Sequence, residues 1–187
     1  EHADNVAAAI LGGLTMVRSI HPVEVKRIRP PGSLRLAIAL PDLYVSTMEA
    51  RKILPKKIPL TSMVRNVARA STMIAAIMEG DIEQFGKAMD DDGVEPIRAK
   101  LIRGYDEVKS AAMRSGASGV TISGSGPAML AVVDRRRSSP EKVAASMAQA
   151  FRREHVGCKT MVSRVGGGIV NDLGPLPSGK RDPEGES

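Results

Sequence analysis

Residues 119–128, GVTISGSGPA, decide the fold because they predict two strands joined by a tight turn. Val, Ile and Thr favour strands over residues 120–123 and 128–133, and the Gly, Ser and Pro residues between them favour a turn. Gly124 and Gly126 also let backbone amides approach a ligand without a Cβ in the way, which suits phosphate oxygens. A hairpin turn that simply requires glycine explains the segment equally well.

The segments on either side of this hairpin predict a sheet and several helices. Residues 34–40 show the alternation of a half-buried strand that ends at Pro41, whereas residues 95–98 are expected to form a loop. Further extended segments are expected over residues 14–20 and 159–165. Helices are expected over residues 6–11, 48–54, 81–89 and 105–115. Two more helices are expected, one from a cap at Thr61 or Ser62 to Gly80 and one from Ser139 onward. This order predicts an α+β fold in which helices pack on one face of a mainly antiparallel sheet.

The chain is expected to have three parts. Residues 1–31 look like the end of a larger N-terminal domain, because helix-like sequence begins directly after Glu1. Residues 32–173 hold the predicted α+β domain. Residues 174–187 are rich in Gly, Pro and Ser and offer almost no apolar surface to bury, so we expect a disordered tail.

The composition is that of an ordinary globular protein of 187 residues, with 42% hydrophobic and 26% charged residues. No apolar run is long enough to predict a membrane span. The 27 Lys and Arg against 21 Asp and Glu give a net charge of +6, which favours an anionic substrate or partner. Aromatic residues make up only 2%, which argues against base-stacking surfaces and hence against nucleic acid as the partner. The single Cys158 and three histidines without ligand spacing predict no disulfide and no metal site, and favour a cytoplasmic location.

Three polar segments could bind a small anionic ligand. His2, Asp4 and Asn5 occur together in HADN, although a helix N-cap at Asp4 or Asn5 is the simpler explanation of that segment taken alone. The other segments contain Arg51, in STMEAR, and Arg98, in EPIR. Two arginines held by a rigid frame could grip a carboxylate bidentately, whereas a single arginine is usually a solvated surface residue.

Taken in order, the motifs HADN with AxxGG, PDxxVSTxxARxxLP, EPxRAxLIxG and GAxGVTISGSGP resemble the C-terminal part of the homoserine kinases, a family of GHMP small-molecule kinases. TISGSGP is typical of the whole GHMP superfamily, whereas HADN and STxxAR are typical of this family. The resemblance covers residues 1–135 well and the remainder more loosely. It implies a GHMP-kinase C-terminal domain preceded by the end of an N-terminal domain that binds substrate and ATP.

The resemblance also implies a substrate site for L-homoserine. The residue matching Asn5 contacts the side-chain end of the substrate, with His2 and Asp4 beside it. Arg51 and Arg98 match arginines that bind the α-carboxylate. A zwitterionic amino acid with a hydroxyl needs such a cationic clamp and a hydrogen-bonding group at its other end.

The implied reaction is ATP-dependent phosphorylation of the homoserine hydroxyl to O-phospho-L-homoserine, a step toward threonine, with Mg²⁺ as the metal. Thr47 matches a catalytic threonine close to the reacting hydroxyl. Gly124, Ser125 and Gly126 match the turn that helps to shape the nucleotide and substrate cleft. No residue has the surroundings of a strong general base, and Asp4 is the only one that could be considered for that role.

One departure from the family pattern is large, because neither the PxxxGLGSS-type phosphate loop nor the upstream carboxylate that holds magnesium occurs in this sequence. The resemblance therefore implies that the N-terminal half of the same protein is the missing partner and that this chain alone is inactive; a homodimer stays open. Three alternatives also stay open: another GHMP small-molecule kinase, a non-catalytic ligand-binding or partner domain, and a basic nucleic-acid-binding module using residues 135–137.

Overall fold

The computed structural model describes residues 3–169, so His2 and the predicted tail lie outside the described residues. The chain divides into two compact units, Glu1–Arg29 with Val165–Ser187, and Pro30–Arg164. The predicted assignment of residues 1–31 and 32–173 to two domains of a larger kinase stays a prediction, because compactness does not show from which domain a segment derives. Within residues 3–169, no helix is both long and apolar enough to cross a membrane.

The first unit consists of helix α1 (Ala3–Leu11) and an antiparallel hairpin of strands β1 (Leu14–Ile20) and β2 (Val23–Ile28). Strand β2 was not expected from the sequence. Helix α1 ends at Leu11 and is followed by Gly12, whose φ of 64° favours glycine. A Cβ at Gly12 would lie 2.1 Å from the backbone carbon of Gly167, so close backbone contact also requires glycine there.

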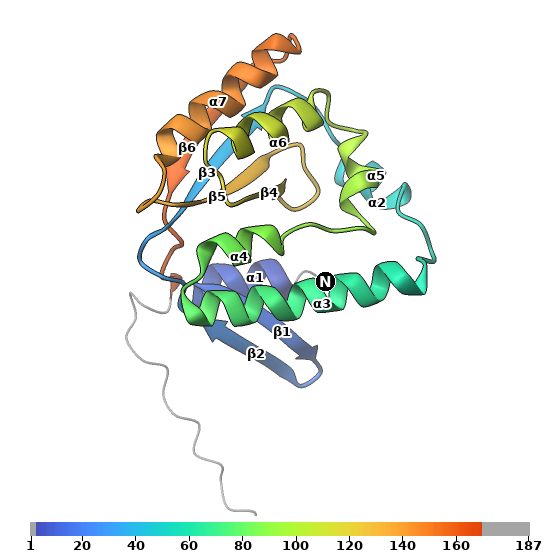
Figure 1. The fold of residues 1–187 in the computed structure, drawn as a ribbon. Coiled ribbons are helices and arrows are strands. Elements are labelled where there is room, and N and C mark those ends of the chain that lie inside the picture. Colours follow the sequence, from blue (N-terminus) through green and yellow to red (C-terminus); the bar gives the residue numbers. More distant parts are fainter. Residues whose placement is uncertain (1–2, 170–187) are drawn as a thin grey trace, which may run out of the picture. The chain divides into compact units, whose positions relative to one another are not determined.

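The second unit is built on a four-stranded sheet (Figure 1). Its strands are β3 (Leu34–Pro41), β4 (Gly119–Ile122), β5 (Met129–Asp134) and β6 (Cys158–Ser163). They lie in the order β4-β5-β3-β6, and every neighbouring pair is antiparallel. The predicted hairpin is therefore confirmed, and its first strand, β4, is an edge strand of the sheet.

Helices α6 (Tyr105–Arg114) and α7 (Pro140–Arg153) cover one face of this sheet. The sheet presents small residues such as Ala37 and Ala131 toward them, and these make room for larger helix side chains such as Met147 and Phe151. All four residues are fully buried. This packing confirms the predicted α+β fold with a mainly antiparallel sheet, and α6 and α7 are the helices that pack on this face.

Four further helices complete the second unit: α2 (Thr47–Lys52), α3 (Leu60–Glu79), α4 (Ile82–Lys87) and α5 (Glu95–Ala99). The loop expected over residues 95–98 was wrong, because α5 forms there. The predicted cap of α3 was also wrong, since the helix begins after Pro59 and not after Thr61 or Ser62. Its predicted end at Gly80 is confirmed, with φ at 77°.

Helix α4 also packs against the sheet, where it contacts strands β4 and β5. Its buried side chains are Ile82 and Phe85. Gly86 is the point of closest approach, because a Cβ there would lie 2.2 Å from the backbone carbon of Ser118. A Cβ at Gly119 would lie equally close, 2.2 Å, to the carbonyl oxygen of Gly86. Backbone therefore packs directly on backbone where α4 meets the sheet.

Candidate functional site

The turn between β4 and β5 forms the centre of the candidate site. The amide of Ser123 donates to Ala128 O at 2.8 Å and that of Gly126 to Ser123 O at 3.0 Å, which closes the turn. Gly124 and Gly126 have φ angles of 59° and 84°, which explains why the turn needs glycine. A Cβ at Gly124 would have no atom within 4 Å, so this side of the turn is open.

Arg98 links the turn to two helices. It lies on α5, is half-buried, and donates from Nη1 to Gly124 O at 3.0 Å. Its Nε donates to Ala50 O of α2 at 3.4 Å, a longer hydrogen bond. The guanidinium is thus held by two backbone carbonyls from different elements, while Nη2 makes no hydrogen bond within residues 3–169.

Helix α2 brings two further predicted residues to the same region. Thr47 is its first residue, and its Oγ1 lies 3.4 Å from Ser125 Oγ in the turn. Arg51 follows four residues later, a spacing that puts the two on the same side of the helix, and its side chain is exposed. The structure therefore brings Thr47, Arg98 and the turn together, with Arg51 on the same short helix as Thr47.

The turn also offers hydrogen-bond donors to a ligand. Within the described part of the chain, the backbone amides of Gly124 and Ser125 donate to no other group. Successive free amides in a glycine-rich turn form a concave donor surface that suits the oxygens of a carboxylate or a phosphate. The candidate site therefore combines free amides, two hydroxyls and a fixed cation.

Asp4 and Asn5 belong to the first unit, whereas the residues above belong to the second. Both are exposed on α1. Because α1 already includes Ala3, neither residue is its N-cap, so that simpler explanation of HADN was wrong. A carboxylate in the first turn, such as that of Asp4, interacts favourably with the helix dipole.

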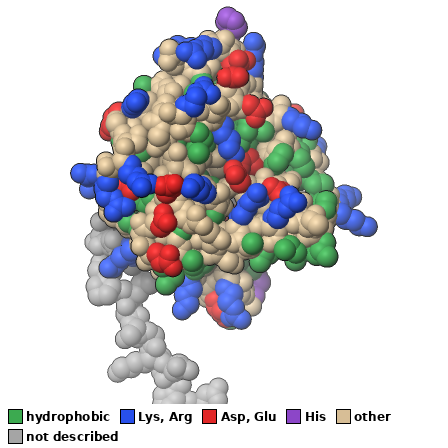
Figure 2. Space-filling model, viewed as in Figure 1, with side chains coloured by type: hydrophobic (Ala, Val, Ile, Leu, Met, Phe, Trp, Pro, Cys, Tyr) green, Lys and Arg blue, Asp and Glu red, His purple; other side chains and the backbone are tan. Residues whose placement is uncertain are grey.

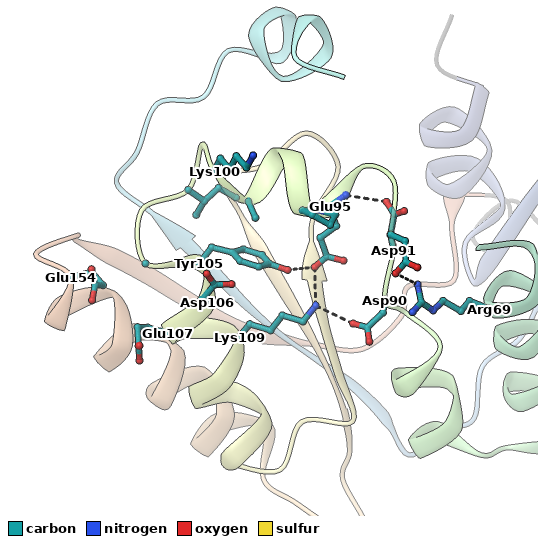
Figure 3. Close-up of a pocket in the computed structure, with 15 residues that line it drawn as sticks. Arg69, Asp90, Asp91, Glu95, Lys100, Tyr105, Asp106, Glu107, Lys109 and Glu154 are labelled. Atoms are coloured by element: carbon teal, nitrogen blue, oxygen red, sulfur yellow. Dashed lines mark hydrogen bonds and ion pairs between the residues drawn. The ribbon is translucent and has the colours of Figure 1, made fainter. Parts of the chain in front are cut away.

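A cavity of about 940 Å³ lies beside α5 and contains an ionic cluster that the sequence analysis missed (Figure 3). Its centre is Glu95, of which only 6% is exposed. The Glu95 carboxylate accepts hydrogen bonds from the Tyr105 hydroxyl, from Lys109 Nζ at 3.2 Å and from Thr121 Oγ1 at 3.3 Å. Lys109 Nζ also donates to Asp90 at 3.0 Å. The signal in the sequence was Glu95 of the EPIR motif, three residues before Arg98.

The electrostatics of this cluster keep two of its donors, Tyr105 and Lys109, protonated. Burial and the adjacent Glu95 carboxylate raise the pKa of Tyr105, so the phenol stays protonated and remains a donor. Burial alone would lower the pKa of Lys109, but its hydrogen bond to Asp90 and the charge of Glu95 outweigh burial and raise that pKa. The cluster therefore does not titrate near neutral pH through either donor.

Within residues 3–169, no group of three or more His, Cys, Asp and Glu side chains could hold a metal ion. The candidate site fits an anionic oxygen, through the amides of the turn and the Arg98 guanidinium.

Comparison with known proteins identifies the class to which this fold and site belong. Residues 73–153 match the family described as GHMP kinases C terminal. This stretch therefore carries the C-terminal domain of the GHMP kinases. Homoserine kinases are among the relatives that match most of the length of this chain.

Two of these relatives come from distant organisms. The homoserine kinase of Methanococcus vannielii is 44% identical over 166 residues, covering 88% of this chain and 52% of that protein. The homoserine kinase of Arabidopsis thaliana is 38% identical over 179 residues, covering 92% of this chain and 48% of that protein. The chain thus spans about half the length of these relatives.

Solved structures of related kinases resemble this chain as well. The crystal structure of homoserine kinase from Cytophaga hutchinsonii superimposes with a TM-score of 0.84 at 37% identity, covering 89% of this chain and 53% of that one. The mevalonate kinase of L. major shares the fold alone, with a TM-score of 0.60 at 17% identity.

Proposed function

We propose that the complete protein transfers a phosphoryl group from ATP to the hydroxyl of L-homoserine and releases O-phospho-L-homoserine, with this chain supplying the C-terminal part. The observation that carries the proposal is the convergence of Arg98, Thr47 and Ser125 on the Gly124 turn, where two amides donate to no other group among residues 3–169. The homoserine kinases that match the chain at 37–44% identity support it.

Each residue has a proposed role in binding. Arg98 presents Nη2 to the substrate carboxylate, since its Nε and Nη1 are already engaged, and Arg51 supplies the second cation. Thr47 lies next to the reacting hydroxyl. Asn5 binds the side-chain end of homoserine, with Asp4 and His2 beside it.

ATP is the proposed phosphoryl donor, and the amides of Gly124 and Ser125 bind negatively charged oxygens near it. When bound, ATP supplies the group that is transferred. The residues of this chain orient the acceptor hydroxyl, because phosphoryl transfer depends mainly on positioning and on stabilisation of charge. We assign no residue of this chain to Mg²⁺. The proposal also includes a cytoplasmic location and leaves a homodimer open.

The test is a coupled assay of ADP release by the complete protein, with L-homoserine, mevalonate and galactose as separate acceptors. We expect ADP release with homoserine, and O-phospho-L-homoserine as the product by mass spectrometry. Turnover with another alcohol but not with homoserine would favour a different GHMP small-molecule kinase. Homoserine binding without turnover with any acceptor would favour a non-catalytic ligand-binding domain.

A further inference from the structure

We propose that Glu95 is a positioning residue that holds Arg98 against the Gly124 turn. This inference rests on the proposed function, because the purpose of the arrangement is to present Arg98 to the substrate carboxylate. Glu95 itself does not touch the substrate in this account. It acts through the helix and the strand that it joins.

Helix α5 cannot hold Arg98 in place by itself. It has five residues, and isolated helices of this length are unstable in water because nucleation is costly. Its position must therefore come from contacts with the rest of the unit. The structure shows two sets of such contacts, one before the helix and one at its first residue.

The first set fixes the chain that enters the helix. The Asp91 carboxylate accepts hydrogen bonds from the backbone amides of Gly93 at 2.7 Å, Val94 at 3.0 Å and Glu95 at 3.0 Å. The side chain of Asn66, on α3, donates to the same carboxylate at 2.6 Å. These bonds satisfy amides that the helix leaves without intrahelical partners.

The second set is made by the Glu95 side chain itself. Its carboxylate is nearly fully buried, and it receives donors from two other elements: Tyr105 and Lys109 from α6, and Thr121 from β4. Figure 3 shows Tyr105 and Lys109 pointing at the carboxylate from the side of α6. A buried charge with this many partners is costly to disturb, because removing one side leaves the others unpaired.

The placement of Thr121 connects this cluster to the proposed site. Thr121 lies on β4 two residues before Ser123, where the turn begins. Glu95 lies on α5 one turn before Arg98. One carboxylate therefore ties together the helix that carries Arg98 and the strand that leads to its acceptor, the carbonyl of Gly124.

The kinetic test uses the complete protein with Glu95→Gln, Arg98→Ala and the double variant. The Gln side chain keeps the size but replaces an acceptor oxygen by an NH₂ group that faces donors. We expect the KM for homoserine to rise about 10-fold in Glu95→Gln, with the KM for ATP within about twofold. If Glu95 acts through Arg98, the double variant should lose no more than Arg98→Ala alone, because both changes remove the same interaction.

Glu83→Gln is the matched control. Glu83 is a carboxylate on α4 that pairs with Lys87 and Arg137 on the surface, so the substitution makes the same change of charge outside the cluster. It should leave both KM values unchanged. Thr121→Val removes a single donor with little change in volume. This milder variant keeps the proposal testable if Glu95→Gln does not fold, and it should raise the homoserine KM about threefold.

A second readout does not depend on activity. In complete protein labelled with ¹⁵N-glycine, Glu95→Gln should shift the amide signals of Gly124 and Gly126, whereas Glu83→Gln should not. Unchanged signals, or additive losses in the double variant, would overturn the positioning role. Failure of the wild-type protein to use homoserine would instead overturn the proposed function, while the amide signals would still decide the role of Glu95.

Discussion

Arg98 and Arg51 carry the same charge in different surroundings. Arg98 is half-buried, and two backbone carbonyls fix its guanidinium before any substrate arrives. Arg51 is exposed on α2. A preorganised donor loses less side-chain entropy on binding, so Arg98 is well placed to define the orientation of a carboxylate.

The first prediction concerns replacement of either arginine in the complete enzyme. Ala at position 51 or 98 removes one donor from the carboxylate, which should cost roughly 2 to 4 kcal/mol of homoserine binding. This corresponds to a KM raised about 30-fold to 1000-fold. Lys should recover only part of the loss at either position, and at position 98 an ammonium group cannot reproduce the planar fork that bonds Ala50 and Gly124.

Steady-state kinetics with homoserine and ATP varied separately measure this effect. The KM for ATP is the internal control, since neither arginine is assigned to the nucleotide. A change of less than about threefold in the homoserine KM of both Ala variants would place the carboxylate clamp elsewhere.

At the scale of elements, those predicted correctly from the sequence carry their own signals. The hairpin of β4 and β5 has β-branched strands around a glycine-rich turn, and α3 ends at a glycine in the left-handed region. Helix α5 was missed because it is too short to show periodicity and depends on the side chains of Asp91 and Glu95 for its position. Such contacts between distant segments leave no local pattern.

The residues of the candidate site also differ in whether a local sequence pattern reveals them. Arg51, Arg98 and the glycine turn were found through their motifs, whereas the burial of Glu95 became visible only with its partners around it. A carboxylate in a sequence is normally expected on the surface. The three side chains that donate to Glu95 lie 10, 14 and 26 residues further along the chain.

The second prediction concerns the acid sensitivity of the segment before α5. Burial alone would raise the pKa of Asp91, but hydrogen bonds from Gly93, Asn66 and the following amides outweigh it and lower that pKa. A lowered folded-state pKa adds stability that is present above the unfolded value of about 3.9 and disappears as the pH falls through the folded value. Asp91→Asn should therefore reduce the free energy of unfolding at pH 7, and this difference should shrink below about pH 4.

Urea unfolding of the wild type and Asp91→Asn between pH 3 and pH 7 measures this difference. Asp106→Asn, on the exposed start of α6, is the control and should follow the wild type throughout. A difference between wild type and Asp91→Asn that does not vary with pH would show that the lost hydrogen bonds matter but the charge of Asp91 does not.

At the scale of the molecule, the net charge is +6. Figure 2 shows acidic and basic side chains interspersed over the visible face. In the basic triplet at residues 135–137, Arg136 pairs with Asp134 and Arg137 pairs with Glu83. These pairs reduce the positive potential available to a phosphate backbone.

The third prediction follows from this distribution of charge. Filter binding to DNA and RNA at about 0.15 M salt should give weak retention that does not depend on sequence and falls steeply as salt is added. Substitution of Arg135, Arg136 and Arg137 by Ser should change the amount of retained DNA and RNA only slightly. Sequence-selective binding in the nanomolar range would instead support a nucleic-acid-binding function.

The fourth prediction compares the 187-residue chain with the complete protein. The chain carries the proposed carboxylate clamp but no phosphate loop of the PxxxGLGSS type, so we expect it not to release ADP in the presence of homoserine. The complete protein, assayed in parallel, provides the positive control. Turnover by the short chain at about 1 to 100 per second would show that the phosphate-binding function lies within these residues.

The close contact between Gly12 and residues 167–168 has a consequence for protein synthesis. The first unit joins two segments that lie far apart in the sequence: Gly13 N donates to Gly166 O at 2.9 Å, and Arg27 donates to Gly167 O at 3.1 Å. A chain that emerges from the ribosome N-terminus first must complete residues 30–164 before the second segment exists. The last contacts of α1 and its hairpin therefore cannot form before residues 166–168 have been added, which is after every residue of the second unit has been synthesised.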